Sequence, residues 1–126
     1  MSAVRVLVVD DQDPFRRAAA AVLDSMDGFD LVGAVASGEE SLTAVADLRP
    51  DLVLMDVNLS GLDGLEATRR IRLRDDPPIV VLVSTYERSD YGDPADPADL
   101  CGADSYLTKS AFDADSVQRV WEEARV

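Results

Sequence analysis

Acidic residues directly follow two apolar runs of this chain. Asp10 and Asp11 come after the run Val4–Val9, and Asp56 ends the run that begins at Leu52. Carboxylates that lie close together raise one another's pKa unless a cation joins them. All-oxygen ligands favour a hard ion, and Mg²⁺ takes a few protein oxygens while keeping several waters. If the fold brings these acids together, the sequence predicts a Mg²⁺ site.

A hydroxyl and an ammonium follow two further apolar runs. Ser84 and Thr85 come after the fourth run, and Thr108 and Lys109 come after the fifth. A carboxylate can attack phosphorus and hold the phosphoryl group, while a metal, an ammonium and a hydroxyl neutralise charge on its oxygens. Asp56 is the best candidate nucleophile, because it stands alone at the end of its strand. Asp10 and Asp11 would hold the ion.

The elements that must position these residues alternate regularly along the chain. Short apolar runs predict buried strands, and runs with helical spacing of apolar residues predict helices between them. The expected strands are Val4–Val9, Leu31–Ala36, Leu52–Val57, Ile79–Val83 and Ser105–Leu107. The expected helices begin at Asp13, Ser37, Leu65 and Asp113, with Asp13 as N-cap and Pro14 at the first helical position. This order predicts an α/β fold, a doubly wound parallel sheet with its ligand site at the carboxyl ends of the strands.

The segment between the last two strands departs from this rhythm. Residues 89–99 carry two prolines and four aspartates. An interior proline costs a helix about 3 kcal/mol. We therefore expect the fourth helix to be shortened or missing, with at most a short helical turn near Pro97–Cys101.

Composition excludes several classes of function. The 126 residues include 25 acidic and 12 basic residues, a net charge of −13, which argues against nucleic acid and an anionic membrane as partners. The absence of histidine excludes imidazole catalysis on this chain. A single cysteine, Cys101, allows no internal disulfide. With neither a targeting segment nor an apolar stretch of about 20 residues, we expect a cytoplasmic protein.

Each candidate site residue has an ordinary interpretation when it is taken alone. Paired aspartates after a strand are more often a helix cap than a metal site, but Asp13 is expected to supply the cap here. Lys109 alone would be a surface lysine, and Ser84 or Thr85 a loop hydroxyl. Four of five strands end in complementary groups, and this conjunction favours the functional interpretation.

Together these motifs resemble the receiver domain of bacterial two-component response regulators. The resemblance runs from Val4 to about Ala124 and is carried by four motifs: Val8-Val9-Asp10-Asp11, Leu54-Met55-Asp56-Val57-Asn58-Leu59, Gly61-Leu62-Asp63-Gly64 and Gly102-Ala103-Asp104-Ser105-Tyr106-Leu107-Thr108-Lys109. It implies a flavodoxin-like sheet of strand order 2-1-3-4-5. It also implies a phosphoacceptor that uses Mg²⁺ and takes its phosphoryl group from a sensor histidine kinase or a phosphotransfer protein.

The resemblance assigns a role to each site residue. Asp56 matches the phosphate-accepting aspartate, Asp11 the direct Mg²⁺ ligand and Asp10 a ligand that acts largely through water. Asn58 would offer its backbone carbonyl to the metal. Lys109 matches the lysine that contacts the phosphoryl oxygens.

The resemblance also implies a switch, and the sequence departs from the family near it. Tyr106 matches the switch aromatic, which moves inward when the strand-four hydroxyl turns toward the phosphate. Ser84 is the preferred hydroxyl, with Thr85 in reserve, because two hydroxyl residues adjoin there. Ser60 and Ser110 stand where the family commonly has proline.

We expect residues 1–126 to form a single receiver domain without an output domain. Such a receiver would be a monomer or a weak homodimer and would signal by docking to another protein. Two alternatives remain open: a receiver-like adaptor that is never phosphorylated, and a phosphatase of the haloacid dehalogenase class. The phosphatase would need a second acid two residues after its nucleophile, but Gln12 stands there relative to Asp10.

Overall fold

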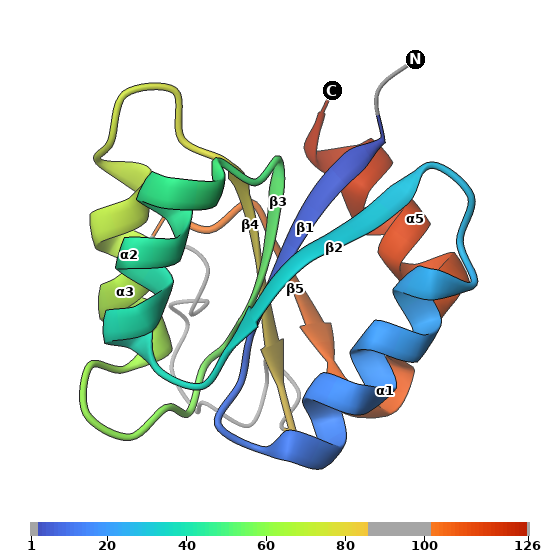
Figure 1. Cartoon of the computed structure of the whole chain (residues 1–126), viewed down its shortest axis with the longest axis horizontal. Coiled ribbons are helices and arrows are strands. Elements are labelled where there is room, and N and C mark those ends of the chain that lie inside the picture. The colour runs from blue at the N-terminus through green and yellow to red at the C-terminus, as the bar shows by residue number, and fades with distance from the viewer. Residues whose placement is uncertain (1–2, 86–101, 126) are drawn as a thin grey trace, which may run out of the picture.

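A five-stranded parallel sheet forms the centre of the protein (Figure 1). The structure, a computed structural model, describes residues 3–85 and 102–125. The elements in chain order are β1 (Val4–Val9), α1 (Asp13–Asp24), β2 (Phe29–Val35), α2 (Gly38–Leu48), β3 (Leu52–Asp56), α3 (Gly64–Arg72), β4 (Ile79–Ser84), β5 (Ser105–Thr108), a 3₁₀ turn at Lys109–Ala111 and α5 (Ala114–Ala124). The strand order β2-β1-β3-β4-β5 confirms the predicted doubly wound, flavodoxin-like arrangement.

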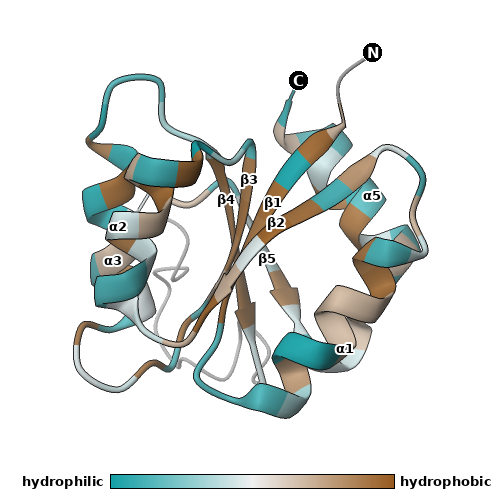
Figure 2. Cartoon of the chain, in the orientation of Figure 1, coloured by the Kyte–Doolittle hydropathy of each residue, from teal (hydrophilic) through white to brown (hydrophobic). Residues whose placement is uncertain are grey.

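Helices cover both faces of the sheet, as the crossover rule requires. Helices α2 and α3 lie on one face, and α1 and α5 lie on the other (Figure 1). Because side chains alternate along a strand, each face has its own apolar core. On β3, Val53 and Met55 face α2 and α3, whereas Leu52 and Leu54 face α1 and α5. The strands are accordingly hydrophobic along most of their length (Figure 2).

The second strand begins two residues earlier than predicted. Gly28 adopts φ +82°, a left-handed conformation that suits glycine, and its carbonyl accepts a hydrogen bond of 2.7 Å from the N–H of Val4. The turn is therefore complete before Phe29, which pairs with Val4 in the sheet. The prediction of Leu31–Ala36 missed this because Asp30 interrupts the apolar run.

The prediction that Asp13 caps the first helix is wrong. Gln12 is the N-cap residue, and no side chain caps this helix. Asp13 lies inside the first turn, where its carboxylate pairs with Arg16 at 3.2 Å and Arg17 at 2.8 Å. A negative charge in the first turn also interacts favourably with the helix dipole, so Asp13 supports the helix without capping it.

Side-chain caps set the start of the other helices. Ser37, Asp63 and Asp113 each accept a hydrogen bond from a backbone N–H three residues later. The Oγ atom of Ser116 accepts a hydrogen bond of 2.9 Å from the N–H of Asp113 in turn and completes a reciprocal cap of α5. Arg49, in the left-handed conformation at φ 48°, ends α2 directly before Pro50, because the residue before a proline resists the helical conformation.

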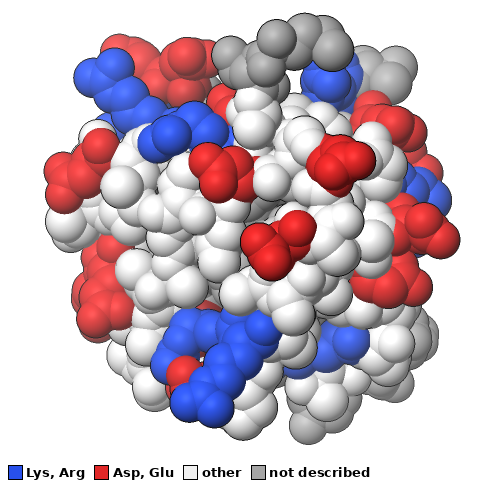
Figure 3. All heavy atoms as spheres, turned by 45° about the vertical axis from the view of Figure 1, so that its right-hand side comes forward, with Lys and Arg blue, Asp and Glu red and all other residues white. Residues whose placement is uncertain are grey.

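Acidic side chains are spread over much of the face shown in Figure 3, and basic side chains gather in a few places. The expected shortening or loss of the fourth helix, and the helical turn near residues 97–101, lie outside the described residues. No helix within the described ranges is long and apolar enough to span a membrane.

Candidate functional site

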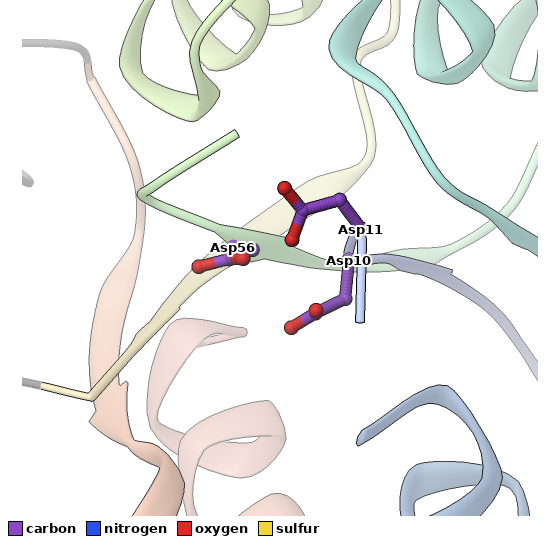
Figure 4. Close-up of side chains that lie close together, drawn as sticks. All are labelled: Asp10, Asp11 and Asp56. Atoms are coloured by element: carbon purple, nitrogen blue, oxygen red, sulfur yellow. The ribbon is translucent and has the colours of Figure 1, made fainter. Parts of the chain in front are cut away.

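Three carboxylates meet at the carboxyl end of the sheet. Asp10 and Asp11 follow β1, and Asp56 is the last residue of β3, which pairs with β1 (Figure 4). One carboxylate oxygen from each residue lies within 4.8 Å of the others. Asp10 and Asp56 are buried, while Asp11 is exposed to solvent. The predicted convergence of these strand ends is confirmed.

Two of the carboxylates accept the same kind of hydrogen bond from the backbone. The Oδ1 atom of Asp10 accepts a hydrogen bond of 2.8 Å from the N–H of Gln12, and Oδ1 of Asp56 accepts one of 3.1 Å from the N–H of Asn58. Each aspartate thus bonds the backbone two residues later, an Asx turn at the end of its strand. These turns fix both carboxylates.

The ammonium of Lys109 lies beside both buried acids. Its Nζ atom is 2.7 Å from Oδ2 of Asp10 and 3.8 Å from Oδ2 of Asp56. Lys109 begins the 3₁₀ turn that follows β5, and its side chain is only 19% exposed. Lys109 therefore lies within ion-pair distance of both acids, although it follows β5, which is an edge strand of the sheet.

The environment of Asp56 opposes its negative charge. Its pKa is raised from an ordinary 3.8 to about 6, mainly by burial and then by the nearby charge of Asp10. The N–H of Asn58 and the ammonium of Lys109 lower the pKa, but they do not outweigh the first two causes. Without a further cation, the three acids and one lysine leave an excess of negative charge in this pocket.

This donor set fits a divalent hard cation. All three residues offer carboxylate oxygens, which Mg²⁺ prefers. The buried Oδ2 atom of Asp10 has the Lys109 ammonium nearby, yet it makes no well-aligned hydrogen bond within the described part of the chain. An ionised carboxylate oxygen can accept from more than one donor, so this oxygen can also contact a cation or its bound water.

The two candidate hydroxyls lie in different surroundings. Ser84 is the last residue of β4 and is fully buried, whereas Thr85 lies beyond the strand and is exposed. Ser84 pairs with Thr108 in the sheet, two residues beyond the pair Leu82 and Tyr106. Because side chains alternate, Ser84 and Tyr106 lie on the same face of the sheet as Leu82. The structure thus brings the preferred hydroxyl and the aromatic to one face.

Two residues that were not predicted as site residues also shape the site. The Nη1 atom of Arg16 donates a hydrogen bond of 2.7 Å to the backbone carbonyl of Asp10, which braces the acidic loop against α1. A Cβ atom on Gly64 would lie 1.9 Å from the carbonyl oxygen of Asp56, so only glycine allows α3 to begin so close to β3. The glycine was visible in the loop motif, but no pattern identified Arg16.

The fold and the site together define a doubly wound α/β domain with an acidic site at the carboxyl ends of its central strands. The family model of the response regulator receiver domain matches residues 6–120. The chain therefore belongs to the response regulator receiver domain family, as its motifs predicted.

Curated relatives agree with this family assignment. The chain is 45% identical over 120 residues to the response regulator GacA of Pseudomonas viridiflava, an alignment that covers 93% of this chain and 53% of the relative. It is 37% identical over 109 residues to the transcriptional regulatory protein LiaR of Bacillus subtilis, covering 86% of this chain and 50% of the relative. The chain spans about half the length of these curated relatives.

Solved structures show the same fold. The receiver domain of the putative response regulator NarL from Mycobacterium tuberculosis superposes with a TM-score of 0.85 at 26% identity, covering 99% of this chain and 98% of that chain. A LuxR-family two-component response regulator from Aurantimonas sp. SI85-9A1 gives a TM-score of 0.84 at 29% identity, covering 98% of this chain and 86% of that chain.

Proposed function

We propose that this receiver domain accepts a phosphoryl group on Asp56 and changes its protein contacts in response. The observation that carries the proposal is the position of Asp56: buried at the end of a central strand, beside two other acids and one ammonium. A buried aspartate placed there for stability alone would be costly, because its charge is opposed by burial and by Asp10.

Phosphoryl transfer onto Asp56 is a direct displacement at the phosphorus of the donor. A carboxylate oxygen of Asp56 attacks the phosphorus of the donor, and a P–O bond to Asp56 forms as the bond from phosphorus to the donor breaks. The electron pair of the broken bond leaves with the donor. The Asx turn with Asn58 keeps the attacking carboxylate oriented during this step.

Asp10, Asp11 and Asp56 would hold Mg²⁺, with the backbone carbonyl of Asn58 as a further ligand and Asp10 acting largely through water. When bound, the ion supplies positive charge that offsets the charge of the phosphoryl oxygens. Lys109 supplies a second positive charge from the side of β5, since its ammonium already lies 3.8 Å from Asp56.

Ser84 and Tyr106 would couple the modification to the surface. A phosphoryl group adds a charge of about −1.5 to −2 and three strong hydrogen-bond acceptors. The hydroxyl of Ser84, at the end of the neighbouring strand, can donate one of the required hydrogen bonds. A shift of Ser84 toward the phosphoryl group changes the packing on the sheet face that it shares with Tyr106.

The donor would be a sensor histidine kinase or a phosphotransfer protein. This follows from family membership and from relatives that are named response regulators. Because this chain contains no histidine, a phosphohistidine donor must lie outside it. The site acts as an acceptor rather than as a general catalyst for phosphate esters.

Intact-protein mass spectrometry after incubation with acetyl phosphate and Mg²⁺ tests the proposal. The wild type should gain the mass of one phosphoryl group, and Asp56→Asn, which keeps the shape but removes the nucleophile, should not. Asp63→Asn is a matched control, since Asp63 caps α3 outside the acidic cluster. A wild type that gains no mass would favour the adaptor interpretation, and rapid turnover of phosphate esters would favour the phosphatase.

A further inference from the structure

An aromatic ring lies close to the ammonium of Lys109, in addition to the carboxylates of the site. The Nζ atom is 4.7 Å from the centroid of the Phe15 ring. Phe15 in turn packs edge-to-face against Phe112, with ring centroids 5.2 Å apart and an angle of 67° between the ring planes. The ammonium thus has one ring of an aromatic pair and two carboxylates as close neighbours.

Both rings are attached to the loops that build the site. Phe15 lies in the first turn of α1, directly after the loop that carries Asp10 and Asp11. Phe112 ends the 3₁₀ turn that Lys109 begins, and its N–H donates a hydrogen bond of 3.3 Å to the Lys109 carbonyl. The two rings therefore adjoin the loop that carries Asp10 and Asp11 and the turn that carries Lys109.

A metal ion can compete with Lys109 for the carboxylates, but it does not compete for the Phe15 ring. Asp10, the nearest partner of Lys109 at 2.7 Å, is also a candidate metal ligand. When a divalent cation interacts with the carboxylate of Asp10, the electrostatic attraction between Asp10 and Lys109 weakens. The face of Phe15 attracts the ammonium through the negative charge of its π system, and a metal ion bound by carboxylates leaves that contact in place.

We propose that Phe15 is a positioning residue for Lys109, a claim that rests on the phosphoacceptor function proposed above. The ring keeps the flexible lysine stem in the conformation that places its ammonium beside Asp56 when metal and donor are bound. A cation–π contact with a mostly buried ammonium changes an equilibrium by a factor of roughly 3 to 30. Phe15 acts through Lys109 and touches no reacting atom itself.

Nuclear magnetic resonance can detect the contact directly, because Lys109 is the only lysine in the sequence. Selective labelling of lysine then gives a single set of side-chain signals. The ring current of Phe15 should shift the ε-CH₂ protons of Lys109 upfield in the wild type. Phe15→Leu should return them to the position of a free lysine, while Phe15→Tyr should keep the upfield shift.

The phosphorylation rate provides the functional test. At saturating Mg²⁺ and with acetyl phosphate as donor, Phe15→Leu should be phosphorylated about 3- to 10-fold more slowly than the wild type, with the half-saturating Mg²⁺ concentration unchanged. Phe15→Tyr should restore most of the rate. Phe112→Leu is the matched control: it removes an aromatic ring from the same cluster but leaves the face that contacts Lys109, so it should lose less than Phe15→Leu.

A second variant separates positioning from packing. Trifluorinated phenylalanine at position 15 keeps the ring but weakens its attraction for a cation, so it too should slow phosphorylation. A wild-type rate in Phe15→Leu or in the fluorinated protein would overturn the proposal. Failure of the proposed function looks different: the wild type itself then gains no phosphoryl group, and the positioning role is overturned with it even if the upfield shift is present.

Discussion

At the scale of single residues, the site brings three carboxylates together, and two of them are buried. Asp56 is 4% exposed and its pKa is raised to about 6, mainly by burial and then by Asp10. A carboxyl group with a raised pKa in the folded state binds its proton more tightly there than in the unfolded chain. Its contribution to stability is therefore present at low pH and is lost as the pH rises from about 4 to about 6.

This sign predicts how Asp56→Asn changes the stability of the metal-free protein. In the presence of a chelator, the variant should be more stable than the wild type above pH 6, by up to about 3 kcal/mol for a shift of this size. The difference should shrink as the pH falls toward 4. Urea denaturation at several pH values measures it, and a difference that does not change with pH would contradict the account of Asp56.

Asp11 and Asp10 should differ in their effect on Mg²⁺ binding. Asp11 is exposed, and family resemblance makes it the direct ligand, so Asp11→Ala should weaken Mg²⁺ binding by more than about tenfold and leave the fold intact. Asp10→Ala should weaken binding less. It should, however, lower the stability of the metal-free protein, because it removes the 2.7 Å ion pair with Lys109.

Titration of the melting temperature with Mg²⁺ measures both effects, since an ion that binds only the folded state raises it. Sodium chloride at matched ionic strength controls for screening of the negative surface. If the Mg²⁺-dependent rise in melting temperature is lost equally in Asp11→Ala and Asp10→Ala, the difference assigned to the two residues is wrong. If the melting temperature of the wild type does not rise with Mg²⁺, the metal site is wrong.

At the scale of elements, the site depends on how closely α3 approaches β3. The Cβ atom of an alanine at position 64 would lie 1.9 Å from the carbonyl oxygen of Asp56 and 2.9 Å from its carbonyl carbon. Gly64→Ala must therefore push α3 away from the strand end that carries Asp56. Overpacking of this kind typically costs about 1 to 3 kcal/mol.

Gly33→Ala is the matched control for this prediction. There a new Cβ atom meets the end of the Leu48 side chain at 2.8 Å, and a flexible side chain can move away. Urea denaturation should show a larger loss of stability for Gly64→Ala than for Gly33→Ala. An equal or smaller loss at position 64 would show that the contact with Asp56 relaxes easily.

Adjacent strands should also transmit the switch. Ser84 ends β4, and Tyr106 lies on the same sheet face in β5. With the phosphoryl mimic beryllium fluoride and Mg²⁺, hydrogen exchange of residues 105–108 should change in the wild type and change less in Ser84→Ala. Thr85→Ala, an exposed neighbour, should behave like the wild type. The reverse pattern would move the role to Thr85.

Sequence patterns predicted those features that depend on strand ends. Parallel strands joined by helical crossovers must bring their carboxyl ends to one edge, so the meeting of Asp10, Asp56 and Lys109 could be predicted from their positions alone. The N-cap of α1 could not, because Asp13 had two acceptable positions. Aspartate suits both the N-cap and the first turn of a helix, and in the structure Asp13 lies in the first turn, where it pairs with Arg16 and Arg17.

Contacts between distant elements were beyond sequence reasoning. The contact of Phe15 with Lys109 depends on the angle at which α1 leaves β1 and on the turn after β5. Periodicity identified Phe15 only as part of an apolar helix face. The bond from Arg16 to the backbone of Asp10 has the same origin, since nothing in the residue types distinguishes it from a surface ion pair.

At the scale of the whole molecule, Asp10 and Asp56 stand out as buried acids in a chain with a net charge of −13. Many acidic side chains lie on the surface, where solvent and salt screen their charge (Figure 3). Asp56 and Asp10 are buried beside Lys109, where the charge is screened least. We therefore expect phosphorylation to select Asp56 from all the acidic residues of the chain.

Chemical mapping of the modified residue tests this claim most directly. After treatment with acetyl phosphate and Mg²⁺, borohydride reduces an aspartyl phosphate to homoserine, which tandem mass spectrometry can locate in the sequence. The account predicts homoserine at position 56 alone, and none when Mg²⁺ is removed by a chelator. Homoserine at Asp10, Asp11 or any surface aspartate, with Asp56 unchanged, would contradict it.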